Sequence, residues 1–289
     1  MCPFTIKHFL TSEKTKKKGL IKLTQCNNGY KFKILNFCME LSEKEKAARR
    51  MVCLPLDGIS SMSGIRDRVE ELSPVIGLFK IGKETYTRFG PTAIDIVKDS
   101  GADVFLDLKY YDIPNTIKGA ARAASELQVY MFNVHASGGS EMMRAAVEGA
   151  SSISISNAYV PLIVGVTVLT SIDRKIMNEE LRVNGTIEEQ VLHLAQLSNE
   201  SGLDGIVCSA ADLYSVKSKL PEKFLYVTPG IKGVNTPAGS DQKRVFTPGS
   251  AVQDGSSILV IGRAITEPKT PEDRLKAGYE ILKDMAKYL

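Results

Sequence analysis

The stretch that decides the fold is ADVFLDLKYYDIPNT, residues 102–116. It begins as an apolar run typical of a buried β-strand, gathers ionisable side chains where that run ends, and passes through Pro114 into a helix-like segment. Side chains two residues apart in a strand point to the same face, so we expect Asp107 and Lys109 to lie side by side. Pro114 stops strand pairing. The stretch therefore predicts one βα unit that carries charged groups at the carboxyl end of its strand.

The same alternation recurs along the chain from residue 51 onward. Strand-like runs occupy residues 51–57, 75–82, 102–109, 129–136, 161–169, 205–210, 224–231 and 258–264. Helix-like stretches occupy residues 61–72, 91–100, 116–127, 140–149, 186–201 and 271–287, and Asn115 or Thr116 is expected to cap the third. Near-continuous apolar strands that alternate with helices are typical of an all-parallel sheet covered by helices.

Eight βα units predict an α/β protein with a single (β/α)8 barrel, the TIM barrel, over residues 51–289. Eight is the number of strands that closes such a barrel, and about 240 residues fit its usual size. An open, doubly wound sheet is the structural alternative. It is disfavoured because no G-x-G-x-x-G turn follows the first strand, where LDGISSMSG, residues 56–64, stands instead.

Residues 1–50 are expected to form a basic N-terminal extension outside the barrel. Residues 1–38 hold eight Lys and one Glu, a local charge of +7, and show no sustained periodicity. Three interpretations remain open: a targeting peptide, a disordered basic arm, or translation from a start codon upstream of the true one at Met39. The absence of a compact apolar core with a small-residue cleavage site argues against secretion.

Composition excludes several classes of protein. The formal charge of +4 becomes −3 once the +7 of residues 1–38 is subtracted, so the body offers no electrostatic reason to bind nucleic acid. No run of eighteen apolar residues predicts a membrane span. Cys53 and Cys208 lie in apolar runs and form no C-x-x-C pair, which favours reduced, buried thiols in a cytoplasmic protein.

Polar side chains stand at the carboxyl end of nearly every predicted strand, which is where barrels of this type carry their chemistry. In chain order they are Asp57, Lys80, Asp107, Lys109, His135, Thr170, Ser171, Ser209, Thr228 and Arg263, which follows Gly262. A lone Asp or Lys at a strand end is more often structural than functional. The whole set together predicts a site at the barrel mouth.

The charged residues of the second and third strands are the strongest candidates. A buried ion pair and a turn are the structural alternative for Asp107 and Lys109, but burying them without further partners costs several kcal/mol. Lys80 on the adjacent strand adds a positive charge at the same level, and Asp112 follows in the loop. An alternating Lys-Asp-Lys-Asp array can keep all four groups ionised, and such an array is preorganised to act on a developing charge.

The loops after the seventh and eighth strands are candidates for holding a phosphate, as they commonly do in barrels. Gly262 lets the backbone approach a ligand, and Arg263 offers a planar fork to phosphate oxygens. The loop from residue 233 to Gln242 has the composition of a lid, with Gln242 at its far hinge.

At these residues the chain resembles the orotidine 5′-phosphate decarboxylase family, in its bacterial form, over essentially residues 51–289. DLKYYDIPNT fits the specific family signature D-x-K-x-x-D-I-P-N-T. FKIGKETYTRFGP, VTVLTS, TPGI followed by SDQKR, and VIGRAIT match further family segments in the same order.

The resemblance implies a cofactor-free carboxy-lyase that converts orotidine 5′-phosphate (OMP) to UMP and CO2 in pyrimidine synthesis. It implies that Lys109 donates a proton to the ring carbon that loses CO2 and that Asp107 faces the departing carboxylate. It further implies that Lys80 bridges Asp107 and a ribose hydroxyl, and that Asp57 also binds the ribose.

The resemblance also implies a homodimer whose active sites are shared. Asp112 would act beside Lys109 of the neighbouring subunit, accompanied by Ile113 and Thr116. Thr170 would contact the pyrimidine, and the phosphate would be held by Gln242, Gly262, Arg263 and Lys232. Bacterial members usually have Arg where Lys232 stands, so the bidentate fork is lost and the phosphate is expected to be held more weakly.

Three other functions compete with this interpretation. Related barrels with D-x-K-x-x-D decarboxylate or condense sugar phosphates with magnesium, although the I-P-N-T tail argues against that reading. Lys109 could instead form a Schiff base, as in an aldolase. A catalytically silent nucleotide-binding scaffold is the third. No metal site is expected, because the three histidines, His8, His135 and His193, are scattered along the sequence.

Overall fold

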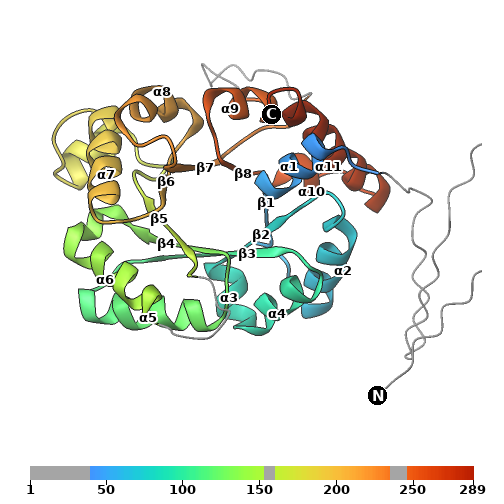
Figure 1. Ribbon diagram of the computed structural model, residues 1–289, viewed down its shortest axis with the longest axis horizontal. Helices are drawn as coiled ribbons and strands as arrows, with labels where there is room; N and C mark the ends of the chain where they lie inside the picture. Colours follow the sequence, from blue (N-terminus) through green and yellow to red (C-terminus); the bar gives the residue numbers. More distant parts are fainter. Residues whose placement is uncertain (1–39, 153–159, 235–245) are drawn as a thin grey trace, which may run out of the picture. The chain divides into compact units, whose positions relative to one another are not determined.

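The barrel is built from eight parallel strands in chain order, and β8 pairs with β1 to close it. The computed structural model describes residues 40–152, 160–234 and 246–289. The strands are β1 Val52–Pro55, β2 Leu78–Gly82, β3 Asp103–Tyr110, β4 Met131–His135, β5 Leu162–Val166, β6 Gly205–Val207, β7 Leu225–Pro229 and β8 Ile258–Val260. Figure 1 looks down this ring of strands, with the helices outside it. The predicted TIM barrel is confirmed.

The helices form the outer layer. They are α1 Glu43–Met51, α2 Met62–Leu72, α3 Lys83–Phe89, α4 Thr92–Asp99, α5 Pro114–Glu126, α6 Gly139–Ser151, α7 Ile187–Glu200, α8 Leu213–Val216, α9 Pro248–Asp254, α10 Arg263–Thr266 and α11 Pro271–Ala286. Short turns of other helix types lie at η1 Ala136–Gly138, η2 Ile176–Glu180, η3 Ala210–Asp212 and η4 Lys217–Lys219. The six predicted helices correspond to α2, α4, α5, α6, α7 and α11.

The predicted cap of α5 is wrong. The helix begins at Pro114 with Ile113 at the N-cap position, and no side chain caps it. Proline suits the first helical position because its missing N–H would have no partner there, so the helix starts two residues earlier than expected.

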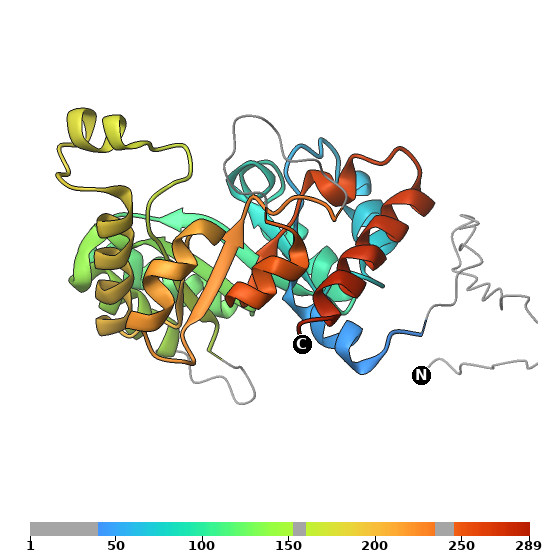
Figure 2. The same cartoon turned by 90° about the horizontal axis from the view of Figure 1, so that it is seen from above.

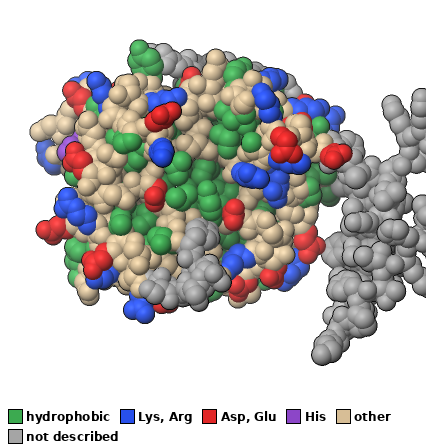
Figure 3. Space-filling model, viewed as in Figure 1, with side chains coloured by type: hydrophobic (Ala, Val, Ile, Leu, Met, Phe, Trp, Pro, Cys, Tyr) green, Lys and Arg blue, Asp and Glu red, His purple; other side chains and the backbone are tan. Residues whose placement is uncertain are grey.

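The barrel interior is a packed core. Its central layer consists of Cys53, Leu78, Phe105, Met131, Val164, Val227 and Ile258, each at most 5% exposed. Because helices cover the outer face as well, each strand is buried on both faces, which explains its near-continuous apolar sequence. In the view of Figure 3, hydrophobic side chains gather at the centre of the barrel end and charged ones surround them. Cys53 and Cys208 are buried free thiols, as expected.

All of helix α1 except Met51 falls in the predicted extension of residues 1–50, but the helix belongs to the same compact unit as the barrel, which spans Ser42–Leu289. Ser42 and Glu45 form a capping box at its start. Arg49 donates two hydrogen bonds to the Ser73 carbonyl, at 3.0 and 2.7 Å, and its own carbonyl accepts from Gly77 N at 2.9 Å. These bonds attach residues 42–50 to the barrel.

The two ends of the barrel differ. In Figure 2, α1 and the C-terminus lie at one end and the segment around η2 lies at the other. Since β1 follows directly on α1, the strands begin at the α1 end and deliver their carboxyl termini to the opposite end. No helix among the described residues is long and apolar enough to cross a membrane.

Candidate active site

Three neighbouring strands bring four charged side chains together at the carboxyl end of the barrel. Lys80 of β2 pairs with Pro55 of β1, and Pro55 stands two residues before Asp57. Asp107 of β3 pairs with Gly82 of β2. Lys109 follows two residues later on β3. Parallel strands in this register place their carboxyl ends at the same edge, so residues far apart in sequence meet there.

The four side chains form a continuous chain of ion pairs with alternating sign, called the charged array below. Lys80 Nζ lies 2.8 Å from Asp57 Oδ2 and 3.0 Å from Asp107 Oδ2. Lys109 Nζ lies 2.5 Å from Asp107 Oδ1. The structure thus brings Asp57, Lys80, Asp107 and Lys109 together within one chain.

Burial makes the charged array electrostatically strong. The side chains of Lys80 and Asp107 are 11% and 10% exposed. Burial by itself lowers the pKa of Lys80, but the carboxylates of Asp107 and Asp57 outweigh it, so the pKa is raised. Burial likewise raises the pKa of Asp107, but Lys80, Lys109 and Asn133 outweigh it, so the pKa is lowered.

These shifts define the pH range over which the pair stabilises the fold. The stability that ionised Asp107 contributes is present above its unfolded pKa near 3.8. It is lost as the pH falls through the pKa of Asp107 in the folded protein, which is lower. The stability that charged Lys80 contributes is present below its unfolded pKa of 10.5. It is lost as the pH rises through the pKa of Lys80 in the folded protein, which is higher. Both groups are therefore charged throughout the neutral range.

Asn133 of β4 belongs to the site, although the sequence analysis did not identify it. Its side-chain nitrogen donates to Asp107 Oδ1 at 2.7 Å, and its side-chain oxygen accepts from the backbone N–H of Lys109 at 2.8 Å. The asparagine is 1% exposed. Its position on a predicted strand, two residues before His135, was the signal that could have identified it.

Gly82 is a second residue that the sequence analysis missed. Its φ of −83° and ψ of 178° are open to any residue, so the backbone does not require glycine there. A Cβ at this position would collide with Asp57 Oδ1 and lie 2.9 Å from Lys80 Nζ, closer than real Cβ contacts allow. The missing side chain therefore leaves the space in which Asp57 and Lys80 pair.

A cavity of about 210 Å³ opens beside the charged array. Lys80, Asp107, Lys109 and Asn133 line one part of it. The remaining walls are Phe105, Val166, Val168, Leu169, Thr170, Val207, Cys208, Pro229 and Val260. Thr170 thus lies at the same cavity as the charged array. A small ligand would meet two ammonium groups and a carboxylate on one side and apolar side chains on the other.

The residues predicted to hold a phosphate follow β7 and β8. Gly262 is half-buried, and Arg263 is exposed at the start of α10. Gly262 has φ −103° and ψ −96°, and a Cβ there would come no closer than 3.7 Å to Pro55, so the space beside its backbone is open. Lys232 is half-buried, and its N–H donates to the Phe246 carbonyl at 3.3 Å. Gln242 lies outside the described residues.

Asp112, Ile113 and Thr116 are exposed. The Asp112 carboxylate accepts a hydrogen bond from Ile113 N at 2.7 Å, and in the part of the chain that the structure describes it makes no ion pair. Ile113 and its neighbour Tyr111 are 66% and 62% exposed, unusually high for large apolar side chains. Within one chain, then, Asp112 does not join the charged array.

Other polar residues at strand ends have structural partners. Thr228 is fully buried and donates to Ser256 Oγ at 2.9 Å. Ser209 bonds to Asp212 through both its N–H and its hydroxyl, each at 2.9 Å. His135 packs edge-on against Tyr111. The pKa of His135 is lowered, mainly by burial and to a lesser extent by the nearby positive charges of Lys83 and Lys109. We therefore assign structural roles to Thr228 and Ser209.

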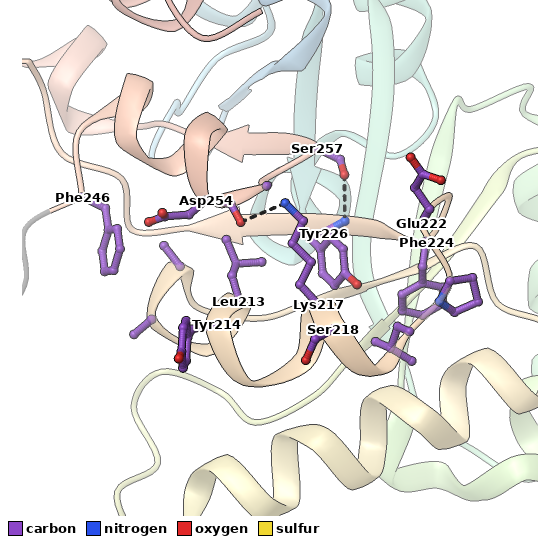
Figure 4. Close-up of a pocket in the computed structure, with 15 residues that line it drawn as sticks. Leu213, Tyr214, Lys217, Ser218, Glu222, Phe224, Tyr226, Phe246, Asp254 and Ser257 are labelled. Atoms are coloured by element: carbon purple, nitrogen blue, oxygen red, sulfur yellow. Dashed lines mark hydrogen bonds between the residues drawn. The ribbon is translucent and has the colours of Figure 1, made fainter.

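A larger cavity, about 870 Å³, lies away from the charged array (Figure 4). Its walls come from η3, α8, η4, the start of β7 and the end of α9, and they include Tyr214, Lys217, Phe224, Tyr226 and Asp254. Lys217 Nζ donates to the Asp254 carbonyl at 3.4 Å. None of the residues predicted for the site lines this cavity, so the charged array marks the better candidate for chemistry.

Metal ligands do not gather at either place. Across residues 40–152, 160–234 and 246–289, no three His, Cys, Asp or Glu side chains form a group that could hold a metal ion.

Comparison with known proteins gives one consistent family. Residues 50–277 match the family described as orotidine 5′-phosphate decarboxylase / HUMPS. The chain is 41% identical over 250 residues to the orotidine 5′-phosphate decarboxylase of Syntrophus aciditrophicus (strain SB), covering 86% of this chain and 97% of that one. It is 45% identical over 227 residues to that of Pseudoalteromonas translucida (strain TAC 125), covering 78% and 94%.

A solved structure agrees with these relatives. The crystal structure of orotidine 5′-phosphate decarboxylase from Lactobacillus acidophilus superposes with a TM-score of 0.71 at 34% identity, covering 81% of this chain and 98% of that one. Fold and sequence similarity therefore extend over nearly the whole length of these relatives.

Proposed function

The chain belongs to the orotidine 5′-phosphate decarboxylase / HUMPS family, and on that basis we propose that it converts OMP to UMP and CO2. The observation that carries the proposal is the charged array at the mouth of the barrel, beside a cavity of about 210 Å³. Relatives of similar length that are named orotidine 5′-phosphate decarboxylase support it.

The proposed chemistry needs a cation and a proton at one ring carbon. The bond between the pyrimidine ring and the carboxylate breaks, CO2 leaves, and the electron pair stays on the ring carbon. The Lys109 ammonium stabilises this carbanion and then transfers a proton to it, which forms UMP and leaves a neutral amine that regains a proton from water.

The other members of the charged array are assigned two roles, which are repulsion of the departing carboxylate and binding of the ribose. Asp107, held ionised by Lys80 and Lys109, faces the departing carboxylate, and repulsion between the two anions is relieved when CO2 leaves. Lys80 and Asp57 bind ribose hydroxyls through the side of their ion pair that remains open. Thr170 contacts the pyrimidine.

The phosphate is assigned to Lys232, Gly262, Arg263 and Gln242. In support, the space beside the Gly262 backbone is open, so a ligand can approach that backbone closely. Arg263 is exposed and can offer two parallel N–H groups to the phosphate. Energy from phosphate binding is thereby available for ordering the charged array around the ring.

We assign Asp112, Ile113 and Thr116 to the active site of a partner subunit in a homodimer. In support, all three are exposed, and so is the neighbouring large side chain of Tyr111. Burying such apolar surface against a second copy is favourable. A carboxylate from the partner would then complete the charged array beside Lys109.

The direct test is the loss of OMP ultraviolet absorbance on incubation with purified protein, with UMP identified as product. Turnover that persists after EDTA treatment supports the proposal, whereas loss of turnover on chelation and recovery with magnesium would favour the sugar-phosphate type of barrel. Borohydride trapping of Lys109 with a carbonyl substrate would favour an aldolase. No turnover by the folded protein would favour a silent scaffold.

We predict that Gly82→Ala lowers kcat/KM for OMP by about 100-fold, because an added methyl group must displace Asp57 and Lys80, and small displacements of catalytic groups are costly. The displaced atoms are the ends of flexible side chains, so the loss of stability should be small. Gly119→Ala in α5 is the matched control, since a Cβ there meets nothing within 4 Å. Equal activity of the two variants would contradict the role of Gly82.

We also predict that Lys232→Arg lowers the KM for OMP by about three- to tenfold with kcat little changed. Arginine can form two parallel hydrogen bonds with a phosphate, whereas lysine acts as a point charge. Lys223→Arg, an exposed lysine before β7, serves as the control. A KM that stays the same or rises would show that Lys232 does not contact the phosphate.

A further inference from the structure

Asn133 makes two hydrogen bonds that together fix both functional groups of β3. Its nitrogen donates to Asp107 Oδ1, and its oxygen accepts from Lys109 N. Asp107 Oδ1 therefore receives Asn133 and Lys109 Nζ, while Oδ2 receives Lys80. The amide can have only one orientation here, because a flipped amide would turn its oxygen toward the carboxylate and its NH2 toward an N–H.

The backbone beside Asn133 departs from regular strand pairing. Leu106 pairs with Phe132 and Tyr110 pairs with Val134, so three residues of β3, 107–109, stand opposite a single residue of β4, Asn133. Lys109 has φ +49°, a left-handed conformation that costs a non-glycine residue on the order of 1 kcal/mol or more. The Asn133 side chain supplies the acceptor that a regular ladder would have supplied to Lys109 N.

This geometry accounts for the choice of residue at 133. An asparagine side chain has a donor for the Asp107 carboxylate and an acceptor for the Lys109 N–H at the same time. An aspartate of the same shape has no donor at neutral pH, and an alanine has neither group. The residue is 1% exposed, so its two hydrogen bonds are shielded from bulk solvent in the intact protein.

From these contacts we propose that Asn133 is a positioning residue: it holds Lys109 in its left-handed conformation and aims both Lys109 and Asp107 at the reacting carbon. The proposal rests on the proposed function for its catalytic part. Its structural part, the bond to the Lys109 amide, can be tested without any activity.

The activity test compares Asn133→Ala and Asn133→Asp with the wild type and with Asn199→Ala on α7 as a control. Asn133→Ala is expected to lower kcat about 100-fold at every pH while KM changes less than tenfold, because Lys109 and Asp107 are no longer held in position relative to the reacting carbon. Asn199→Ala should match the wild type. A kcat for Asn133→Ala within twofold of the wild type would overturn the proposal.

Asn133→Asp gives a readout that a merely structural role would not. It keeps the acceptor for Lys109 N but sets a second carboxylate against Asp107, and two carboxylates at this distance favour sharing one proton. The shared proton restores a donor, so kcat relative to the wild type should rise at least tenfold from pH 8 to pH 5.5. Asn133→Ala should show no such rise, and its absence in Asn133→Asp as well would overturn the proposal.

The charged groups that face position 133 are Asp107 and Lys109 of β3, Lys80 of β2 and, at the end of the same strand, His135. The paired residue on β5, Val164, is uncharged. Dividing by the wild-type profile removes the part of the His135 contribution that the variants share with the wild type.

Amide hydrogen exchange separates this inference from the proposed function. In the wild type the Lys109 amide should exchange as slowly as the ladder amides of β3, and in Asn133→Ala at least about tenfold faster. If the wild type fails to turn over OMP, the proposed function fails but this test remains. If neither variant folds, fast exchange of the Lys109 amide in the wild type would still overturn the proposal, and slow exchange would support it.

Discussion

Replacing Lys109 with alanine is expected to lower kcat for OMP by at least about four orders of magnitude while UMP still binds. The substitution removes both the cation that stabilises the carbanion and the proton that ends the reaction, and each contribution is typically worth about 100-fold or more. UMP carries no carboxylate on the reacting carbon, so its affinity should change by less than about tenfold. Steady-state kinetics and calorimetric titration with UMP measure the two quantities.

The stability of this variant should be nearly normal, which separates lost chemistry from lost folding. Asp107 keeps its ion pair with Lys80 and its hydrogen bond from Asn133 when Lys109 is removed. Lys283→Ala is a suitable control, because Lys283 is exposed and its ion pair with Glu280 and its contact with the Tyr279 ring lie on α11. An alanine variant at 109 that kept kcat within tenfold of the wild type would refute the proton-donor assignment.

The sequence was sufficient for the barrel and for the meeting of Lys80, Asp107 and Lys109. Strand order and the positions of strand ends follow from the repeated apolar runs, and parallel strands deliver their ends to one edge. Three separate stretches of sequence could therefore be assigned to one place. The signature around Lys109 then pointed to the chemistry.

The contacts that refine this site could not be predicted in the same way. Apolar periodicity reports burial, but it does not report the shifted register between Leu106 and Tyr110 or the left-handed Lys109 that Asn133 holds. The role of Gly82 depends on where the ends of two side chains meet in space. Neither feature changes the local pattern of apolar and polar residues.

Helix α1 shows a different limit of sequence reasoning. Its sequence, EKEKAARRM, is dominated by charged residues, and Ala48 is the only residue of the helix that is buried. Hydrogen bonds of Arg49 help to attach it to the barrel, and a single buried residue gives no apolar stripe to recognise in the sequence. The Ser42 and Glu45 spacing of a capping box was the signal available at its start.

The second large effect is expected from pairing damaged subunits. Asp112→Ala, like Lys109→Ala, should leave a homodimer with little activity, because each active site would lose its partner's carboxylate. In a mixed dimer, one site carries both substitutions, whereas the other combines intact Lys109 with intact Asp112. After full exchange of equal amounts, half of the dimers are mixed and half of their sites are intact, so about one quarter of wild-type activity should return.

A matched mixture makes the same test independent of how active each variant is alone. When wild type is exchanged with a chain that carries both substitutions, neither site of a mixed dimer is intact, because one lacks Lys109 and the other lacks Asp112. Shared sites therefore predict about one quarter of the wild-type activity of an equal total amount of protein, whereas sites contained within single chains predict about one half. One half here, together with no recovery in the first mixture, would assign Asp112 to its own chain, and the exposed Tyr111 and Ile113 would need another explanation.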